Sequence, residues 1–214
     1  MISQSEMPLA ILGASRLVPL VTIERLEDAV PLARALVEGG LPVMEVALRT
    51  PVAAQAIAEI LRHVPQAAPI AGNVLTAHDL SIAAHAGACM AVSPVATPAL
   101  LDAAAHGSLP FMPGVATPSE LMLAITKGFH VVKFFPAMAF GGPEALRAMH
   151  APFPHVRFLP TGGTGEGELA AWLALPNVAA VGGSWLAPID EVRRGDWGAI
   201  RDRARAVVGR LRAY

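Results

Sequence analysis

The feature that most constrains the fold is a repeat of short apolar, β-prone segments, spaced by roughly twenty to twenty-six residues. This spacing leaves room for one helix and two short loops between strands, which is the βα unit of a parallel sheet. Eight such segments begin near Leu17, Val43, Pro69, Ala88, Leu109, His130, Val156 and Ala179. Eight βα units predict an α/β fold, a single (β/α)8 barrel, with a doubly wound open sheet as the alternative.

Helical patterns lie between these segments. The stretch 26–40 places Leu26, Val30, Ala33 and Val37 on one face and stops at a glycine pair, which is a helix-ending signal. No linker, low-complexity tract or change in composition divides the chain. We therefore expect residues 1–214 to form one domain.

Composition excludes several classes of protein. A hydrophobic fraction of 54% with 15% charged residues is far from the disordered class, and a net charge of −1 does not suggest binding to nucleic acid or to a membrane surface. The apolar runs are interrupted before the roughly 20 residues that a membrane span needs. Residues 1–15 show no export signal, and Cys89 is the only cysteine, so an internal disulfide is excluded. We expect a cytoplasmic protein.

Lys133 stands in the apolar segment HVVKFFPA, where a buried ammonium group would carry a large desolvation cost. The chain has 14 Arg and only two Lys, Lys127 and Lys133. Arginine stays protonated, whereas a buried lysine can lose its proton and attack a carbonyl. Lys133 is therefore a candidate nucleophile. The alternative is a lysine whose stem crosses a hydrophobic rim while its head reaches water.

Glu45 is the only charged residue in the second apolar segment, and Arg49 follows just past its end. Alternation places Glu45 on the same face as Val43 and Ala47. Glu45 is a candidate general base and Arg49 a candidate clamp for a substrate carboxylate. The alternative is a structural ion pair between these two residues. In a barrel, the second and sixth strands approach across the interior, so Glu45 and Lys133 are expected to share one cavity.

Glycine-rich loops follow the seventh and eighth segments, with the sequences TGGTG and GGS. Barrels often hold phosphate after these two strands, where glycine lets backbone N–H groups converge on an anion. Each loop alone is also explained as a plain turn. Together they predict one phosphate site.

Other motifs give weaker signals. The spacing of the seven histidines, including His78 and His85, does not match a metal site, and no GxGxxG segment suggests a dinucleotide. The C-terminal stretch 197–214 reads as an amphipathic helix with a solvated arginine face.

The segments MEVALRT, VVKFFPA, FLPTGG and GGSW, in this order and at predicted strand ends, resemble the 2-keto-3-deoxy-6-phosphogluconate (KDPG) aldolases. These are class I pyruvate aldolases of the Entner–Doudoroff pathway. The likeness runs from about Val18 to about Ala206. It implies a TIM barrel that assembles as a homotrimer and needs no metal or other cofactor.

The resemblance assigns roles residue by residue. It implies that Lys133 forms the Schiff base, that Glu45 transfers protons and that Arg49 binds the substrate carboxylate. Other positions implied to bind substrate are Asn73, Pro94, Phe134, Thr161 and, for the phosphate, Gly162, Gly163, Gly183 and Ser184. The chain departs from the family pattern at Asn73, where threonine is common, and at Val95 and Thr164.

The sequence thus predicts reversible cleavage of KDPG to pyruvate and D-glyceraldehyde 3-phosphate. Alternatives within the same chemistry are aldolases for the 4-epimeric phosphogalactonate or for 4-hydroxy-2-oxoglutarate. Alternatives from other classes are a phosphate-binding barrel isomerase and a non-catalytic sugar-phosphate binder.

Overall fold

The computed structural model describes residues 6–211. Within this range the strands are β1 Leu17–Val21, β2 Val43–Ala47, β3 Ala68–Gly72, β4 Ala91–Val92, β5 Phe111–Met112, β6 Gly114–Val115, β7 Val131–Phe134, β8 Arg157–Pro160 and β9 Val181–Gly183. Every predicted strand position is occupied, and the fifth holds two short segments. All strand pairs are parallel.

The sheets close on themselves. Hydrogen-bonded neighbours run β5-β4-β3-β2-β1-β9 in one sheet and β6-β7-β8 in the other. Pro113 separates β5 from β6 because proline has no N–H to donate, yet its carbonyl accepts the Lys133 N–H at 2.9 Å. On the other side, β8 joins the segment before β9 through the parallel bridge between Phe158 and Val178. These junctions confirm the (β/α)8 barrel.

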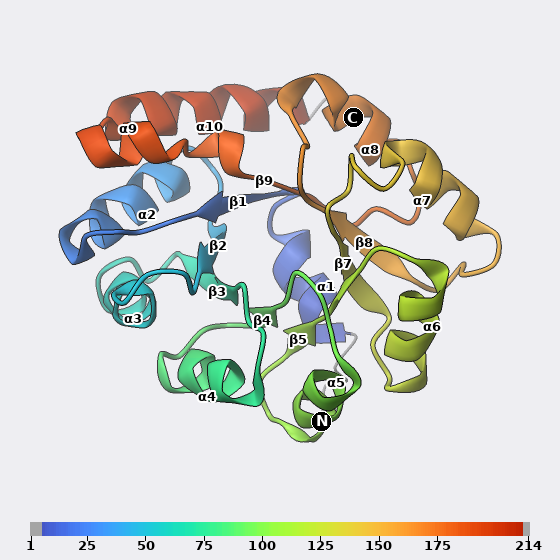
Figure 1. The fold of residues 1–214 in the computed structure, drawn as a ribbon. Coiled ribbons are helices and arrows are strands. Elements are labelled where there is room, and N and C mark those ends of the chain that lie inside the picture. The colour runs from blue at the N-terminus through green and yellow to red at the C-terminus, as the bar shows by residue number, and fades with distance from the viewer. Residues whose placement is uncertain (1–5, 212–214) are drawn as a thin grey trace.

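Helices surround the strands (Figure 1). They are α1 Glu6–Gly13, α2 Ala29–Glu38, α3 Ala53–His63, α4 Ala77–His85, α5 Pro98–His106, α6 Pro118–Thr126, α7 Gly142–His150, α8 Leu169–Leu173, α9 Ile189–Arg194 and α10 Trp197–Leu211, with short 3-10 turns η1 Leu26–Asp28, η2 Glu166–Glu168 and η3 Ser184–Leu186. Side chains of Thr76, Thr97 and Thr117 cap α4, α5 and α6, which fixes where these helices begin. The predicted C-terminal helix forms as α10, and residues 212–214 of that prediction lie outside the described part.

The buried face of α2 differs from the predicted one. Its buried residues are Ala29, Leu32, Ala33, Ala35 and Leu36, whereas the predicted Leu26, Val30 and Val37 are only partly buried. The apolar stretch is nearly continuous, so its spacing alone did not fix which stripe faces the barrel. Gly39 and Gly40 do end this helix, as predicted.

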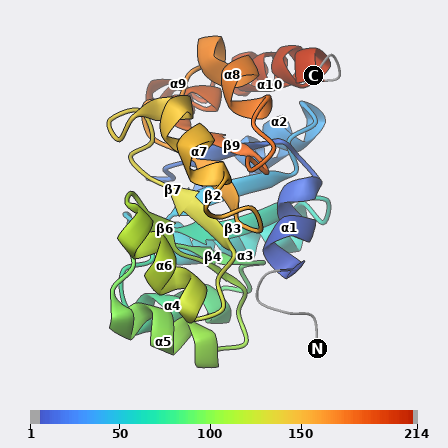
Figure 2. The same cartoon turned by 90° about the vertical axis from the view of Figure 1, so that its right-hand side faces the viewer.

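The core has two layers. One cluster fills the barrel interior and consists of Leu12, Val18, Val43, Ile70, Met90, Val92, Met112, Val131, Leu159 and Ala180. A larger cluster lies between the strands and the surrounding helices. Leu12 reaches the inner cluster from α1, which lies at one end of the barrel (Figure 2). Because α1 precedes β1 and closes the N-terminal end, the strand C-termini are left for chemistry.

No helix in residues 6–211 has both the length and the apolar character needed to cross a membrane.

Candidate active site

Lys133 and Glu45 meet inside the barrel. The Lys133 ammonium donates to Glu45 Oε1 at 2.7 Å and to Oε2 at 2.9 Å. Lys133 lies on β7 and Glu45 on β2, and both residues are buried, at 3% and 1% exposure. Strand alternation puts them on the inner face, because Val131 and Val43, two residues earlier on each strand, belong to the inner cluster. The structure thus brings together the two residues that the sequence placed in one cavity.

Glycine at position 72 makes room for this pair. A Cβ atom built on Gly72, at the end of β3, would lie 2.4 Å from Glu45 Oε1, much closer than atoms can approach. Gly114 on β6, which pairs with Lys133, is similarly confined: a Cβ there would lie 2.2 Å from the Pro94 carbonyl oxygen. Neither glycine was singled out in the sequence, since the need for it comes from a side chain or loop on a neighbouring strand.

Three predicted binding residues follow adjacent strands. Arg49 comes after β2, Asn73 after β3 and Pro94 after β4, so they border the same part of the barrel mouth. Arg49 is exposed, and among residues 6–211 its guanidinium has no ion pair or hydrogen bond. Glu45 pairs with Lys133 and not with Arg49, so the alternative of a structural Glu45–Arg49 pair is not what the structure shows. Asn73 adopts a left-handed backbone with φ 59°.

The two glycine loops also lie side by side, because β8 and the chain leading into β9 are neighbours in the barrel. Gly162 and Gly163 have φ values of 97° and 74°, in the left-handed region that favours glycine. Thr161 is buried, and its hydroxyl has no hydrogen-bond partner among the described residues. Ser184 is exposed at the start of η3.

Phe134 is a correction to the predicted site. Its ring is fully buried in the layer between strands and helices and meets Phe158 edge to face, with centroids 6.4 Å apart. Alternation turns it away from the interior, since its neighbour Lys133 points inward. The aromatic residue that faces Lys133 is Phe135, whose ring centroid lies 5.6 Å from the ammonium nitrogen.

Cys89 lies just before β4, at the opposite end of the strands from these residues, and packs against the inner cluster. Burial raises the pKa of the Cys89 thiol. A raised pKa disfavours the nucleophilic thiolate, and the half-buried Cys89 side chain packs as a small hydrophobic residue.

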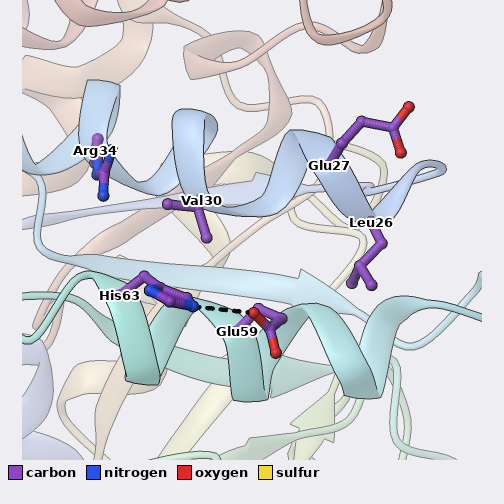
Figure 3. Close-up of a pocket in the computed structure, with 6 residues that line it drawn as sticks. All are labelled: Leu26, Glu27, Val30, Arg34, Glu59 and His63. Carbon is purple, nitrogen blue, oxygen red and sulfur yellow. Dashed lines mark ion pairs between the residues drawn. The ribbon is translucent and has the colours of Figure 1, made fainter.

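A surface cavity of about 540 Å³ lies on the outside of the barrel, between the η1–α2 segment and α3 (Figure 3). Its walls include His63 and Glu59, whose Nε2 and Oε2 atoms are 3.2 Å apart. None of the predicted site residues lines it. Within residues 6–211 no cluster of three or more histidine, cysteine, aspartate or glutamate side chains has the arrangement of a metal site.

Comparison with known proteins finds aldolases that are similar over most of this chain. The family model for KDPG and KHG aldolases matches residues 9–203. The KHG/KDPG aldolase of Escherichia coli (strain K12) is 46% identical over 199 residues, which is 93% of each chain. The 2-dehydro-3-deoxy-phosphogluconate aldolase of Pseudomonas aeruginosa is 42% identical over 92% of this chain and 90% of its own.

Solved structures agree. The KDPG aldolase of Legionella pneumophila, with pyruvate captured at low pH as a covalent carbinolamine intermediate, superposes with a TM-score of 0.91 at 43% identity, covering 94% of this chain and 98% of its own. The enzyme of Zymomonas mobilis ZM4 with 3-phosphoglycerate gives a TM-score of 0.88 at 39% identity, covering 93% of each chain. This chain belongs to the KDPG and KHG aldolase family.

Proposed function

We propose that this protein is a class I, Schiff-base aldolase that reversibly cleaves KDPG to pyruvate and D-glyceraldehyde 3-phosphate. The observation that carries the proposal is the buried contact between Lys133 and Glu45 in a barrel whose C-terminal end holds two glycine loops and Arg49, which has no ion pair within the described residues. The relatives named as KDPG aldolases support it, as does the covalent pyruvate in the Legionella enzyme.

The first step is attack of the Lys133 amine on the C2 ketone of the substrate. The attacking nitrogen must first lose a proton, and the Glu45 carboxylate lies within hydrogen-bond distance to accept it. Glu45 returns this proton to the departing hydroxyl of the carbinolamine, which leaves as water; the product is an iminium, and Glu45 is a carboxylate again. This cation withdraws electrons from the C3–C4 bond, which is the purpose of the covalent intermediate.

Glu45 then serves the bond cleavage. It takes the proton of the C4 hydroxyl, directly or through water, as the C3–C4 bond breaks and the aldehyde leaves. The electron pair moves onto C3 and forms an enamine on Lys133. Glu45 returns a proton to C3, and hydrolysis of the new iminium releases pyruvate and the free amine.

We infer the orientation of the substrate from the residues at the C-terminal ends of the strands, where Arg49 and Asn73 lie on one side of the barrel and the two glycine loops on the other. We assign the keto-acid carboxylate to Arg49, because a guanidinium fork matches a carboxylate, with Asn73 as a second donor. Pro94 and Thr161 border the carbon chain. We assign the phosphate to Gly162, Gly163, Gly183 and Ser184. Holding both ends of the substrate fixes C2 against the Lys133 nitrogen.

One alternative substrate is favoured by an observation. The Escherichia coli relative is named for both KDPG and KHG, and KHG, 2-keto-4-hydroxyglutarate, is the same compound as 4-hydroxy-2-oxoglutarate. This compound is therefore a second candidate substrate for this chain. The 4-epimeric phosphogalactonate is a third. An isomerase or a non-catalytic binder would not require a lysine that forms a covalent bond with the substrate, so trapping of such a bond separates these alternatives from an aldolase.

Two measurements test the proposal. Incubation with pyruvate and borohydride should add a reduced pyruvyl group to the peptide that carries Lys133; labelling of Lys127 instead, or of no residue, would contradict the mechanism. Pyruvate release should then be compared for KDPG, its 4-epimer, 4-hydroxy-2-oxoglutarate and the unphosphorylated analogue of KDPG. A higher kcat/KM for KDPG supports the assigned substrate. Equal values with and without phosphate would shift the assignment to a small keto acid.

We further propose that the enzyme is a homotrimer, as the sequence resemblance implies. Light scattering of the purified protein should give three times the chain mass of 22.2 kDa. The cytoplasmic location also stays a prediction.

A further inference from the structure

A side-chain hydrogen bond joins the ends of β8 and β9. The Thr164 hydroxyl donates to the Gly182 carbonyl oxygen at 2.6 Å, and Thr164 is buried. Thr164 directly follows the Gly162–Gly163 pair, and Gly182 directly precedes Gly183 and Ser184. The bond therefore connects the two loops to which we assign the substrate phosphate.

The backbone provides no equivalent link at this point. Among residues 6–211, β8 bonds to the chain leading into β9 through Phe158 alone, whose N–H donates to Asn177 and whose carbonyl accepts from Ala179. Pro160 is the next residue of β8 that faces this neighbour, and it has no N–H. The seam between β8 and β9 is thus held by backbone hydrogen bonds at Phe158 and, beyond the C-terminal end of β8, by the side chain of Thr164.

The two loops are closely packed beside this hydrogen bond. A Cβ atom on Gly182 would lie 2.4 Å from Thr161 Oγ1, and one on Gly183 would lie 3.3 Å from Thr164 Oγ1. The side chains of Thr161 and Thr164 therefore pack directly against the backbone of Gly182 and Gly183, where a larger residue would not fit. Gly162 and Gly163 have left-handed backbones, and glycine is conformationally free, so the bond made by Thr164 directly after them restricts this part of the loop.

We propose that Thr164 is a positioning residue that aligns the two phosphate-binding loops with each other. The inference rests on the proposed function. Loss of its hydroxyl leaves the Gly182 carbonyl without this donor and lets the loops separate, so binding of the phosphate is weakened. Lys133 and Glu45 lie on β7 and β2, neither of which forms the seam between β8 and β9, so we expect their chemistry with pyruvate to be unaffected.

The experiment compares Thr164→Val, which keeps the shape of the side chain, with Thr164→Ser, which keeps the hydroxyl. Each variant is assayed with KDPG, with its unphosphorylated analogue and for deuterium exchange into the pyruvate methyl group. Thr164→Val should raise the KM for KDPG about tenfold, the scale of one lost buried hydrogen bond. Exchange and use of the unphosphorylated analogue should stay at wild-type rates, and Thr164→Ser should restore the KM.

Thr126→Val is the matched control, because the Thr126 hydroxyl also donates to a backbone carbonyl, that of Leu123, but on the exposed end of α6. It should behave as the wild type.

An unchanged KM for KDPG in Thr164→Val overturns the inference while leaving the proposed function intact. A parallel fall in exchange and cleavage overturns it too, because Thr164 would then support the fold in general. If the wild type has the same kcat/KM for KDPG and for its unphosphorylated analogue, the assignment of the phosphate to these loops is wrong, and the inference about Thr164 is wrong with it. Thr164→Ala replaces the valine variant if circular dichroism shows that the latter does not fold.

Discussion

The two lysines of this chain each meet a carboxylate, one inside the barrel and one on its surface. Lys133 contacts Glu45 with only 4% and 2% of the two side chains exposed, whereas Lys127 at the end of α6 contacts Asp102 of α5 with 34% and 50% exposed. A surface pair contributes about 0–1 kcal/mol, while a buried pair carries a desolvation penalty of several kcal/mol for each ion. Apolar side chains would fill the barrel mouth at lower cost, so the Lys133–Glu45 pair is explained by chemistry rather than by stability.

The surface pair also limits an argument made from composition. Arginine occupies 14 of the 16 basic positions, and this scarcity of lysine supported the interpretation that Lys133 has a task that arginine cannot perform. Lys127 forms an ordinary ion pair, and arginine would serve equally well there. The scarcity of lysine therefore does not single out Lys133 as the candidate nucleophile; the position of Lys133 in an apolar strand does.

The largest expected effect separates the two lysines. Lys133→Arg should abolish KDPG cleavage and pyruvate trapping although it keeps the positive charge, because a guanidinium is not a usable nucleophile. Lys127→Arg should retain wild-type turnover. Pyruvate release and the mass of the borohydride-treated protein measure both. Comparable losses in the two variants would mean that Lys133 has no chemical role that Lys127 lacks.

The two carboxylates should differ in the same way. Glu45→Gln should lower turnover by roughly 10²-fold or more, the usual scale for a positioned acid–base group. It should slow deuterium uptake into the pyruvate methyl group while the imine with pyruvate still forms. Asp102→Asn is the matched surface control and should change neither rate. Unchanged exchange in Glu45→Gln would assign proton transfer to another group.

A third contrast is between two glycines that follow β8, Gly163 in the loop and Gly167 in η2. Gly163 has a left-handed backbone, and an added Cβ would lie 2.9 Å from the Met138 Cβ, whereas an added Cβ at Gly167 meets nothing within 4 Å. Gly163→Ala should lower kcat/KM for KDPG about tenfold, since a hydrogen bond to a charged group contributes roughly 1.5–3 kcal/mol. Gly167→Ala should be silent. Exchange of the pyruvate methyl group should be the same in both, and a shared loss would show a general disturbance of the loop.

The sequence predicted the parts of this molecule that depend on spacing along one strand. The barrel follows from the repeat, and Glu45 and Lys133 follow from single charges in apolar strands. The sequence motif contains both Phe134 and Phe135 but does not indicate which of the two side chains faces the barrel interior. Strand alternation from Lys133 places Phe135 inside and Phe134 outside, so the predicted site was wrong by one residue. Pro113, which divides the fifth strand into β5 and β6, can be seen in the sequence as a proline in an apolar segment. Whether it interrupts a strand depends on whether a neighbouring strand would accept a hydrogen bond from an N–H at that position, which the sequence does not show.

Features that depend on contacts between strands were not predictable. Gly72 is needed because Glu45 on the next strand occupies the space of its side chain. Thr164 was seen only as a departure from a family pattern, and its bond to Gly182 depends on how β8 and β9 are aligned. A residue type at such a position is explained by a partner far away in the chain, which local patterns do not contain.

The smallest expected effect concerns an ion pair between the two extremes. Arg203 on α10 contacts Glu191 on α9 with a two-pronged contact of 2.5 and 2.8 Å, and 16% of the Glu191 side chain is exposed. The hydrogen bonds from Arg203 hold the pKa of Glu191 below its ordinary value of 4.5. Because the folded state lowers this pKa, the pair stabilises the fold above the ordinary value, and this stability is lost as the pH falls through the lower one.

Glu191→Gln should therefore reduce the free energy of unfolding at pH 7 by less than about 1 kcal/mol, the scale for partly exposed pairs. The difference from the wild type should shrink as the pH is lowered below 4.5, where the wild-type carboxyl also becomes neutral. Urea unfolding at a series of pH values measures it. Glu144→Gln is the control, since its pair with Arg147 leaves 77% of the glutamate exposed. A stability difference for Glu191→Gln that stays constant down to acidic pH would mean that packing of the side chain, and not its charge, carries the effect.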